Sequence, residues 1–484
     1  MNNLFRKSAC LFPIIFLCLL TSAQSITGSW NGTLHVQSNN FPIVFHIGKD
    51  SDGKLIATFD SPSQNAFDLA VSEVFTKEDS ITLMMAILNG KYAGVLSPDK
   101  KTINGTWFQG SAAFPLNMMK TSDTATVKQQ LRPQTPKPPF SYQTKDVEYW
   151  NADKSIRYGA TLTSPAKEID APKKGFPAVI LITGSGQQDR DETMLGHKPF
   201  AVIAGNLTKK GFAVLRVDDR GMGKTTGDFS QATSLDFAKD VEAGLDFLEA
   251  QPEVNKENIG LIGHSEGGLI APIVAGERKD VKFIVLLAGP GIPTIDLMQQ
   301  QSEAIDVSGG HSLAEAKATS GFLRVIWEEL NKNEDTATTN KNIRTRAADW
   351  AKTLDTATLA KIRTRIALPV DDYLRKATAA ASGKWFRYFI SFNPQPYLQK
   401  LQCKVLALGG SKDVQVIAQT NLPGITAALQ KSHSSRYDVI ELPGLNHLFQ
   451  TCTKCSPAEY GDLEETFSPT ALAVMDDWLL ENVR

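Results

Sequence analysis

The sequence carries almost no net charge. Its 51 Lys and Arg residues balance 52 Asp and Glu residues, which leaves a formal charge of -1, and no long run of one sign stands out. Such a chain has no overall electrostatic field that would attract a polyanion. We therefore expect neither a nucleic-acid partner nor binding to an anionic membrane surface.

Cysteine is scarce, with 5 residues in 484. Two of them, Cys10 and Cys18, lie in an N-terminal segment that we expect to be removed. Cys403, Cys452 and Cys455 remain, an odd number that cannot all pair within one chain. The last two have the spacing of a redox pair or half a metal site, but no second close pair of Cys or His completes a zinc site. We expect a small loop disulfide or two free thiols there, and no bound metal.

The N-terminal apolar run is too short to span a bilayer. Residues 9–20 fall below the ~20 apolar residues that a membrane helix needs. A basic pair, Arg6-Lys7, precedes this run, and the small residues 21–23 follow it, as in a cleavable export signal. We expect residues 1–23 to be a signal peptide and the mature chain to begin at Gln24 in the periplasm or the medium. An uncleaved membrane anchor is the alternative.

The length exceeds what one core usually holds, and 42% of the residues are hydrophobic, so we expect two or three globular domains. Residues 24–120 consist of short alternating runs separated by turn pairs such as Asn89-Gly90 and Asn104-Gly105. This pattern is typical of a small antiparallel β-sandwich or barrel. Residues 121–139 are polar and rich in proline, which predicts an interdomain linker.

Strand-like and helix-like segments alternate from residue 140 onward, which predicts βαβ units and a mostly parallel sheet. The alternation breaks between residues 293 and 395, where the patterns are helical and no buried strand is evident. We therefore expect one α/β domain, formed by residues 140–292 and 396–484, with a helical insertion between the two parts. Placed over the C-terminal ends of the strands, such an insertion would cap a substrate pocket and limit the access of water.

A G-x-S-x-G motif, Gly263-His264-Ser265-Glu266-Gly267, lies between a strand-like and a helix-like run. The bare pattern arises by chance in a chain of this length roughly one time in ten, so the strand-turn-helix context carries the argument. A serine at the tip of such a turn needs glycine two positions before and two after it, because a Cβ there would collide with neighbouring backbone. Ser265 is therefore the predicted nucleophile.

A serine nucleophile needs a histidine base and a carboxylate that orients the base, and on this kind of sheet they follow in the order Ser, acid, His. Of the three histidines after Ser265, His311 falls in the predicted insertion and His433 in a polar turn. His447 comes in a loop after a strand-like run and is the predicted base. Asp413, in the loop after the preceding strand-like run, is the predicted acid; its alternative role is to cap the next helix.

An oxyanion hole needs two backbone N–H donors. The first predicted donor is Glu266, which directly follows the nucleophile. The second should come from the glycine-rich loop after the strand-like run at 178–182, where Gln187 is the predicted donor and Gly186 the alternative.

These segments form an ordered series of motifs: Gly184-Ser185-Gly186 with Asp189-Arg190-Asp191, Asp218-Asp219-Arg220-Gly221-Met222-Gly223-Lys224, the G-x-S-x-G motif, Asp413 before Gln415-Val416, and Asn446-His447. In this series the chain resembles exported bacterial serine esterases of the α/β-hydrolase superfamily, which carry a small N-terminal β domain. The resemblance covers nearly the whole mature chain. It implies the α/β-hydrolase fold and hydrolysis of a small-molecule carboxylic ester by Ser265, Asp413 and His447, without metal or organic cofactor.

Other interpretations are weaker. We expect Asp218-Asp219-Arg220 to form a buried charge network rather than a substrate site, because buried charges are usually paired. Gly223-Lys224-Thr225 lacks the earlier glycine of a phosphate loop, which disfavours a nucleotide site.

A peptidase or amidase of the prolyl oligopeptidase type would need propeller repeats that the N-terminal region cannot supply. A non-catalytic cell-envelope binding protein is the other alternative, and the oligomeric state is open.

Overall fold

The computed structural model divides the chain into two units, Met1–Gln129 and Gln130–Arg484. It describes residues 26–36, 39–62, 66–85, 90–109, 112–122, 124, 132–166, 172–332, 335–366 and 370–483. The predicted signal peptide and residues 123 and 125–131 of the predicted linker lie outside these ranges. Within them, no helix combines the length and the apolar character that crossing a membrane requires.

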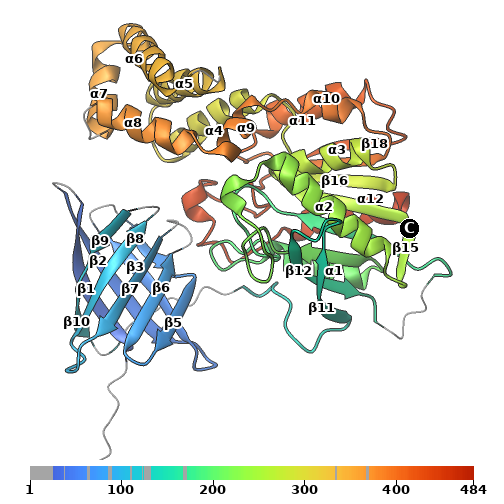
Figure 1. Ribbon diagram of the computed structural model, residues 1–484, viewed down its shortest axis with the longest axis horizontal. Helices are drawn as coiled ribbons and strands as arrows, with labels where there is room; N and C mark the ends of the chain where they lie inside the picture. The colour runs from blue at the N-terminus through green and yellow to red at the C-terminus, as the bar shows by residue number, and fades with distance from the viewer. Residues whose placement is uncertain are drawn as a thin grey trace, which may run out of the picture. The chain divides into compact units, whose positions relative to one another are not determined.

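The first unit is one continuous antiparallel sheet, and its described residues form ten strands (Figure 1). The strands are β1 Gly28–Val36, β2 Asn39–Lys49, β3 Leu55–Ser61, β4 Ala66–Ala70, β5 Glu73–Lys77, β6 Ser80–Met85, β7 Gly90–Leu96, β8 Thr102–Gln109, β9 Ala112–Pro115 and β10 Met118–Ser122. Their order is β4-β3-β2-β1-β10-β8-β7-β6-β5, with β9 paired to β8. The sheet curls around a single core that includes Trp30, Phe45, Tyr92 and Trp107. The unit is therefore a half-barrel, which is closer to the predicted barrel than to the predicted sandwich.

The second unit is built on a mostly parallel sheet, as predicted. Its eight strands follow the order β11-β12-β14-β13-β15-β16-β17-β18. Their bounds are β11 Gln143–Trp150, β12 Arg157–Ser164, β13 Phe176–Ile182, β14 Ala213–Val217, β15 Val254–His264, β16 Val281–Leu287, β17 Lys404–Gly410 and β18 Tyr437–Leu442. Only β12 runs antiparallel to its neighbours β11 and β14, and the pairings from β14 to β18 are parallel. The C-terminal ends of the central strands therefore meet at one edge.

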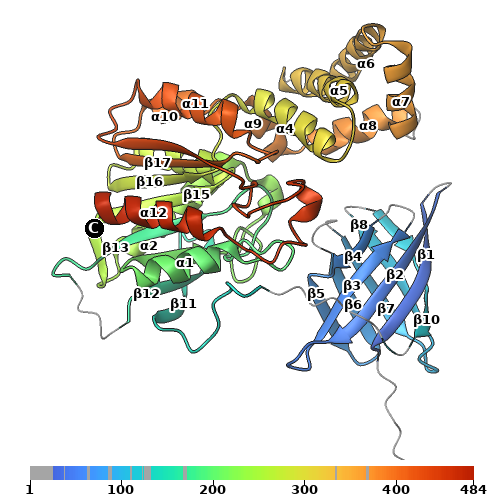
Figure 2. The ribbon, with the colours of Figure 1, turned by 180° about the vertical axis from the view of Figure 1, so that it is seen from behind.

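Helices cover both faces of this sheet (Figure 2). The helices are α1 Pro199–Lys209, α2 Ser234–Glu249, α3 Gly267–Glu277, α11 Ala418–Leu429 and α12 Pro469–Asn482. Residues of α1 and α12 pack with Val179 and Leu181 of β13 in one core, and residues of α2, α3 and α11 pack with Ala178 and Ile180 in the other. Because successive strand residues point to opposite faces, β13 is apolar throughout.

A helical insertion separates β16 from β17, as predicted. It consists of α4 Thr294–Ser308, α5 Leu313–Asn331, α6 Thr336–Lys352, α7 Thr356–Ile366, α8 Val370–Ala381, α9 Lys384–Ser391 and α10 Gln395–Gln399, and its described residues contain no strand. The outer helices share a small apolar cluster of their own, which includes Phe322, Ile326 and Trp327 of α5. Figure 1 shows the insertion as a layer in yellow and orange beside the sheet.

The second half of the predicted linker is part of the α/β unit. Arg132 donates hydrogen bonds to the carbonyl oxygens of Leu195 and Gly461 at 2.9 and 2.7 Å. Gln134 donates to the carbonyl oxygen of Phe467 at 2.7 Å. Burial lowers the pKa of Arg132 to about 10. A proline-rich composition predicted an extended segment but could not indicate that its polar side chains bind carbonyl groups distant in sequence.

Candidate active site

Ser265 lies at a sharp turn between β15 and α3. Its φ of +52° is in the left-handed region, which costs a non-glycine residue about 1–2 kcal/mol. A Cβ on Gly263 would lie 2.0 Å from the carbonyl oxygen of Gly267, and a Cβ on Gly267 would lie 2.2 Å from that of Ile182. The steric reason for both glycines of the motif is therefore confirmed, and the turn presents Ser265 at the edge where the strands end.

Asp413 and His447 meet at the same edge, in the loops after β17 and β18. His447 Nδ1 lies 2.8 Å from Asp413 Oδ2, and each residue is 4% exposed. The other carboxylate oxygen of Asp413 accepts the backbone N–H groups of Gln415 and Val416 at 2.7 and 2.9 Å. The N-cap of α11 is Ile417. Asp413 is thus held as a partner of His447 and is not the helix cap of the alternative interpretation.

Ser265 and His447 line the same cavity, which has a volume of about 190 Å³. Helices α4 and α9 of the insertion supply part of its wall, through Leu297, Met298, Gln301, Trp385 and Phe389. Met194, Pro290, Val416 and Leu448 extend the apolar surface, and the remaining lining residues are Gly184, Ser185, Gln188, Glu192, His264, Glu266 and Gln415.

The other two histidines that follow Ser265 are not at this cavity. His311 is exposed, directly before α5. His433 is exposed between α11 and β18, where its backbone N–H donates to the carbonyl oxygen of Leu401. The structure therefore brings together Ser265 and His447 and leaves His311 and His433 apart from them.

The loop of residues 183–192, here called the oxyanion loop, passes beside Ser265 but does not present Gln187 to the cavity. Gln187 instead donates its side-chain N–H to the carbonyl oxygen of Arg220 at 2.6 Å, and Gly186 lines a separate, smaller cavity. Of this loop, Gly184, Ser185, Gln188 and Glu192 line the cavity, and the backbone N–H groups of Gly184 and Gln188 donate to the carboxylates of Glu192 and Asp219. The prediction that Gln187 donates to the oxyanion finds no support in this geometry.

Two consecutive carboxylates after β14 hold the oxyanion loop. Asp218 accepts from the guanidinium of Arg190 at 3.0 and 2.6 Å and from the backbone N–H of the same residue at 2.9 Å. Asp219 accepts from the hydroxyl of Thr183 at 2.9 Å and from the backbone N–H of Gln188 at 2.7 Å. Burial raises the pKa of Asp219 to about 8.

Arg220 completes the cluster through Asp240. Its guanidinium donates to the two carboxylate oxygens of Asp240 at 2.7 and 2.9 Å, and the hydroxyl of Tyr158 donates to the same carboxylate at 2.5 Å. Asp218 and Arg220 are therefore paired with opposite charges and order the loops, as the sequence indicated, whereas Asp219 accepts hydrogen bonds from uncharged groups.

The Glu266 side chain links the turn that holds Ser265 to the helical insertion. Its Oε1 accepts hydrogen bonds from the hydroxyl of Ser234 at 2.6 Å and from the indole N–H of Trp385 at 2.8 Å. Glu266 is 2% exposed, and this burial raises its pKa. Trp385 belongs to α9, and both residues line the cavity. One hydrogen bond therefore connects the insertion to the residue that follows the nucleophile.

A second buried histidine, His264, lies beside His447, with the ring centroids 4.8 Å apart. Its Nδ1 is 2.9 Å from Glu192 Oε1, and its Nε2 is 3.0 Å from the carbonyl oxygen of His447. The same Glu192 oxygen accepts the backbone N–H of Gly184 at 2.7 Å. Neither His264 nor Glu192 was among the predicted site residues. Their only sequence signals were a position next to Ser265 and a position next to Asp189-Arg190-Asp191.

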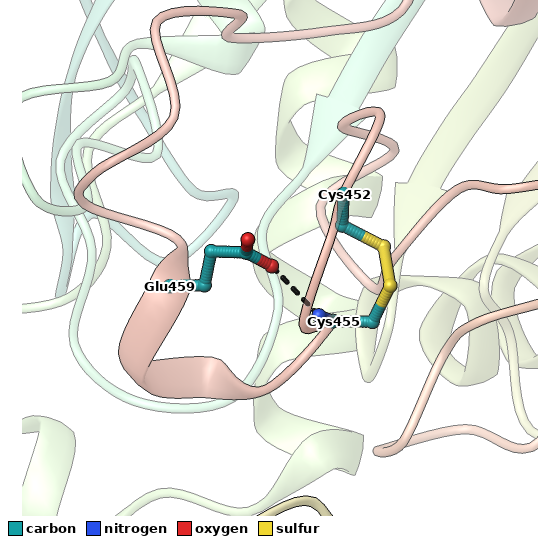
Figure 3. Close-up of side chains that lie close together, drawn as sticks. All are labelled: Cys452, Cys455 and Glu459. Atoms are coloured by element: carbon teal, nitrogen blue, oxygen red, sulfur yellow. Dashed lines mark hydrogen bonds between the residues drawn. A yellow bond between two sulfur atoms is a disulfide. The ribbon is translucent and has the colours of Figure 1, made fainter.

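A disulfide joins Cys452 and Cys455 just after His447 (Figure 3). The Glu459 carboxylate accepts the backbone N–H of Cys455 at 2.6 Å, together with those of Thr453 and Lys454. Of the two arrangements left open by the sequence, the structure has the small loop disulfide. Cys452, Cys455 and Glu459 are also the one group of three potential ligand side chains found among the described residues. Because the sulfurs are bonded to each other and the carboxylate holds three N–H groups, this group acts as a clamp on the loop.

The chain is similar to known hydrolases. A family described as "Serine aminopeptidase, S33" matches residues 198–367, less than half of the chain. Esterase EstD of Thermotoga maritima is 24% identical over 325 residues, which are 66% of this chain and 64% of EstD. The matched part is therefore less than two thirds of that relative's length.

The chain also resembles solved structures, at lower sequence identity. A hypothetical protein of Pseudomonas aeruginosa has a TM-score of 0.43 at 16% identity, covering 73% of this chain and 98% of that protein. An esterase of Pyrococcus furiosus has a TM-score of 0.38 at 14% identity, covering 71% of this chain and 94% of that protein. The second unit has the fold of the α/β-hydrolases, and the half-barrel is a separate N-terminal domain.

Proposed function

We propose that the protein is a serine hydrolase that cleaves small carboxylic esters through an acyl-enzyme. His447 Nε2 removes the proton of the Ser265 hydroxyl as the serine oxygen attacks the ester carbonyl. Asp413 accepts the Nδ1–H of His447, which fixes the tautomer and stabilises the imidazolium that forms. The imidazolium then protonates the leaving alcohol, and a water molecule activated by His447 releases the acid.

The oxyanion in this mechanism rests on two backbone N–H groups. Glu266 supplies one, as predicted from the sequence. We assign the other to Ser185 in place of Gln187, because Ser185 lines the cavity and Gln187 does not. The buried network around Asp218 and Asp219 would keep this donor in place without reorganisation during the reaction.

The observation that carries the proposal is the buried hydrogen bond of 2.8 Å between Asp413 and His447, at a cavity that Ser265 also lines. A helix cap or a structural serine would not require these three residues to converge from three different strand ends. The name of the relative EstD, an esterase, agrees with this chemistry.

The cavity favours a small neutral acyl group. Its wall is largely apolar, and its two carboxylates, Glu192 and Glu266, are already held by hydrogen-bond donors of the protein. We propose that α4 and α9 act as the cap predicted from the sequence, because their side chains close one side of the cavity. The predicted export to the periplasm or medium is likewise a proposal.

An aminopeptidase is the competing function, since the matching family carries that description. Such an enzyme must bind the ammonium group of a peptide N-terminus, which calls for an available carboxylate in the pocket. Among the residues that line this cavity, both carboxylates have other partners, as described above. The geometry therefore favours an ester over a peptide with a free N-terminus.

The test is hydrolysis of p-nitrophenyl esters from acetate to octanoate by the chain from Gln24, beside aminoacyl p-nitroanilides. Ser265→Ala and His447→Ala should abolish turnover, and His433→Ala, which alters an exposed histidine, should retain it. A fluorophosphonate should label the parent and fail to label Ser265→Ala. Faster turnover of the anilides would overturn the ester assignment, and a folded chain that neither turns over esters nor takes the label would favour the binding protein.

A further inference from the structure

Both ring nitrogens of His264 face hydrogen-bond acceptors. Nδ1 lies 2.9 Å from the Glu192 carboxylate, and Nε2 lies 3.0 Å from the backbone carbonyl oxygen of His447. A carbonyl oxygen can only accept, so Nε2 carries a proton. A neutral imidazole has one N–H, whereas an imidazolium has two and satisfies both contacts. A protonated histidine paired with an ionised glutamate would therefore satisfy both contacts.

The pair connects three segments of the site. His264 immediately precedes Ser265, its Nε2 holds the backbone of His447, and Glu192 Oε1 holds the backbone N–H of Gly184 in the oxyanion loop. Apolar residues cover one side of it, since Phe200, Leu287, Leu448 and Phe467 line the small space beside the two side chains. In such surroundings a charge-assisted hydrogen bond is stronger than it is in water.

The conformation of Glu192 is consistent with this role. Its φ of +51° lies in the left-handed region, which is unusual for a residue with a side chain. Its side chain is 3% exposed. Residues that keep such a conformation are over-determined by their surroundings and cluster at functional sites.

We propose that Glu192 and His264 form a buried ion pair. This pair fixes the positions of the oxyanion loop, Ser265 and His447 relative to one another. His264 and Glu192 are then positioning residues for the reaction proposed above, on which this inference rests. Their loss would displace the His447 backbone or the Gly184 N–H by about 1 Å without changing the residues that contact substrate.

The charged and titratable groups that face His264 are Glu192 of the oxyanion loop, His447 of the loop after β18, and Asp413 of the loop after β17. Burial by itself lowers the pKa of His264, but the Glu192 carboxylate, its hydrogen bond, the carbonyl of His447 and Asp413 together raise it above the ordinary value. The alternative is a neutral pair in which Glu192 keeps the proton and donates it to Nδ1.

Glu192→Gln removes the charge with little change in volume and is the direct test. We expect kcat for a p-nitrophenyl ester to fall about 10- to 100-fold with KM changed less than threefold, because misplacement of about 1 Å costs that much in rate. Asp476→Asn is the matched control, since Asp476 is also a buried carboxylate, 6% exposed, whose partner at 2.7 Å is Asn206 of α1. Unchanged kcat in Glu192→Gln, or an equal loss in both variants, would overturn the positioning role.

A second measurement on the full chain does not depend on activity. With ¹⁵N-labelled histidine, and with the signals assigned by their loss in His264→Gln and His447→Gln, both ring nitrogens of His264 should still carry protons at pH 7, above the ordinary histidine pKa of about 6.5. The His447 Nδ1–H signal should shift in Glu192→Gln and stay in place in Asp476→Asn. One protonated nitrogen on His264 would overturn the ion pair even if esters are hydrolysed. If no ester is hydrolysed, the proposed function fails. The histidine signals would still show whether Glu192 and His264 form an ion pair.

Discussion

The turn that holds Ser265 and the loop that holds His447 present their residues to the same cavity by different means. Residues 263–267 are shaped by backbone contacts with neighbours close in sequence and with β13. Glycine is needed at positions 263 and 267 because a Cβ there would collide with backbone atoms. The loop of residues 443–455 is held by side chains. Asn446 accepts the N–H groups of Leu448 and Gln450 at 3.0 and 2.9 Å, and Asp413 holds His447 itself.

The difference shows why one of the two segments can be recognised from a short motif. A steric requirement allows only glycine at two fixed positions around the serine. It therefore appears in the sequence as the G-x-S-x-G pattern. A loop held by side-chain hydrogen bonds, local at Asn446 and distant at Asp413, is marked in the sequence only by single polar residues, and the sequence contains many other residues of the same types. The predictions that follow test this contrast.

The largest effect should come from Asp413→Asn. The amide can donate to Nδ1 of His447 and so stabilise the wrong tautomer, and kcat should fall by about 10⁴-fold with little change in KM. Ester kinetics beside the Asp476→Asn control would measure it. A loss smaller than tenfold in a folded variant would remove Asp413 from the mechanism.

In the Ser265 turn, Gly267→Ala should destabilise the protein by about 4 kcal/mol or prevent folding. Its Cβ would lie 2.2 Å from a backbone carbonyl oxygen that cannot move without displacing β13. The matched change in the His447 loop is Gly444→Ala, where φ is +77° and no atom lies within 4 Å of the new Cβ. That variant should lose only about 1–2 kcal/mol. Urea unfolding followed by circular dichroism compares them, and equal losses would contradict the steric argument.

The side-chain bonds of the oxyanion loop should make stability depend on pH. The folded pKa of Asp219 is about 8, above its unfolded value, so between pH 4 and pH 8 the folded state binds the extra proton. The free energy of unfolding therefore decreases as the pH rises through this window, by an amount on the order of 3 kcal/mol from this group. In Asp219→Asn this part of the decrease should vanish. Urea titrations at pH 5 and pH 8 measure the change, and parallel slopes in both proteins would refute it.

The smallest effect should come from the Cys452–Cys455 disulfide. It closes a very short loop, so its removal in a Cys452→Ser/Cys455→Ser variant should cost about 2 kcal/mol, and kcat should fall less than fivefold. Dithiothreitol should reproduce both changes in the parent and leave the variant unaffected, while the buried Cys403 remains in both. A parent indifferent to the reductant would mean that the clamp does not support His447.

Trp385 and Glu266 illustrate what sequence reasoning could not reach. Glu266 was predicted from its position after Ser265, but its side-chain bond to an indole 119 residues away was not. Similarly, counting along the oxyanion loop pointed to Gln187, whereas Ser185 and Gln188 of this loop line the cavity and the Gln187 side chain donates to the carbonyl oxygen of Arg220. Both outcomes depend on which polar groups approach within 3 Å after folding.

The sequence by itself determined the alternation of strands and helices, the place of the insertion, the turn at Ser265, and the order in which Asp413 and His447 follow. These depend on backbone sterics, on side-chain periodicity and on the rule that parallel strands end at a common edge, all of which act along the chain. Only the tertiary structure decided the contact between Glu192 and His264, the docking of Arg132 and which residues of the oxyanion loop line the cavity. Those features arise where segments far apart in sequence meet in a buried, apolar space, and there hydrogen-bond geometry selects the partner.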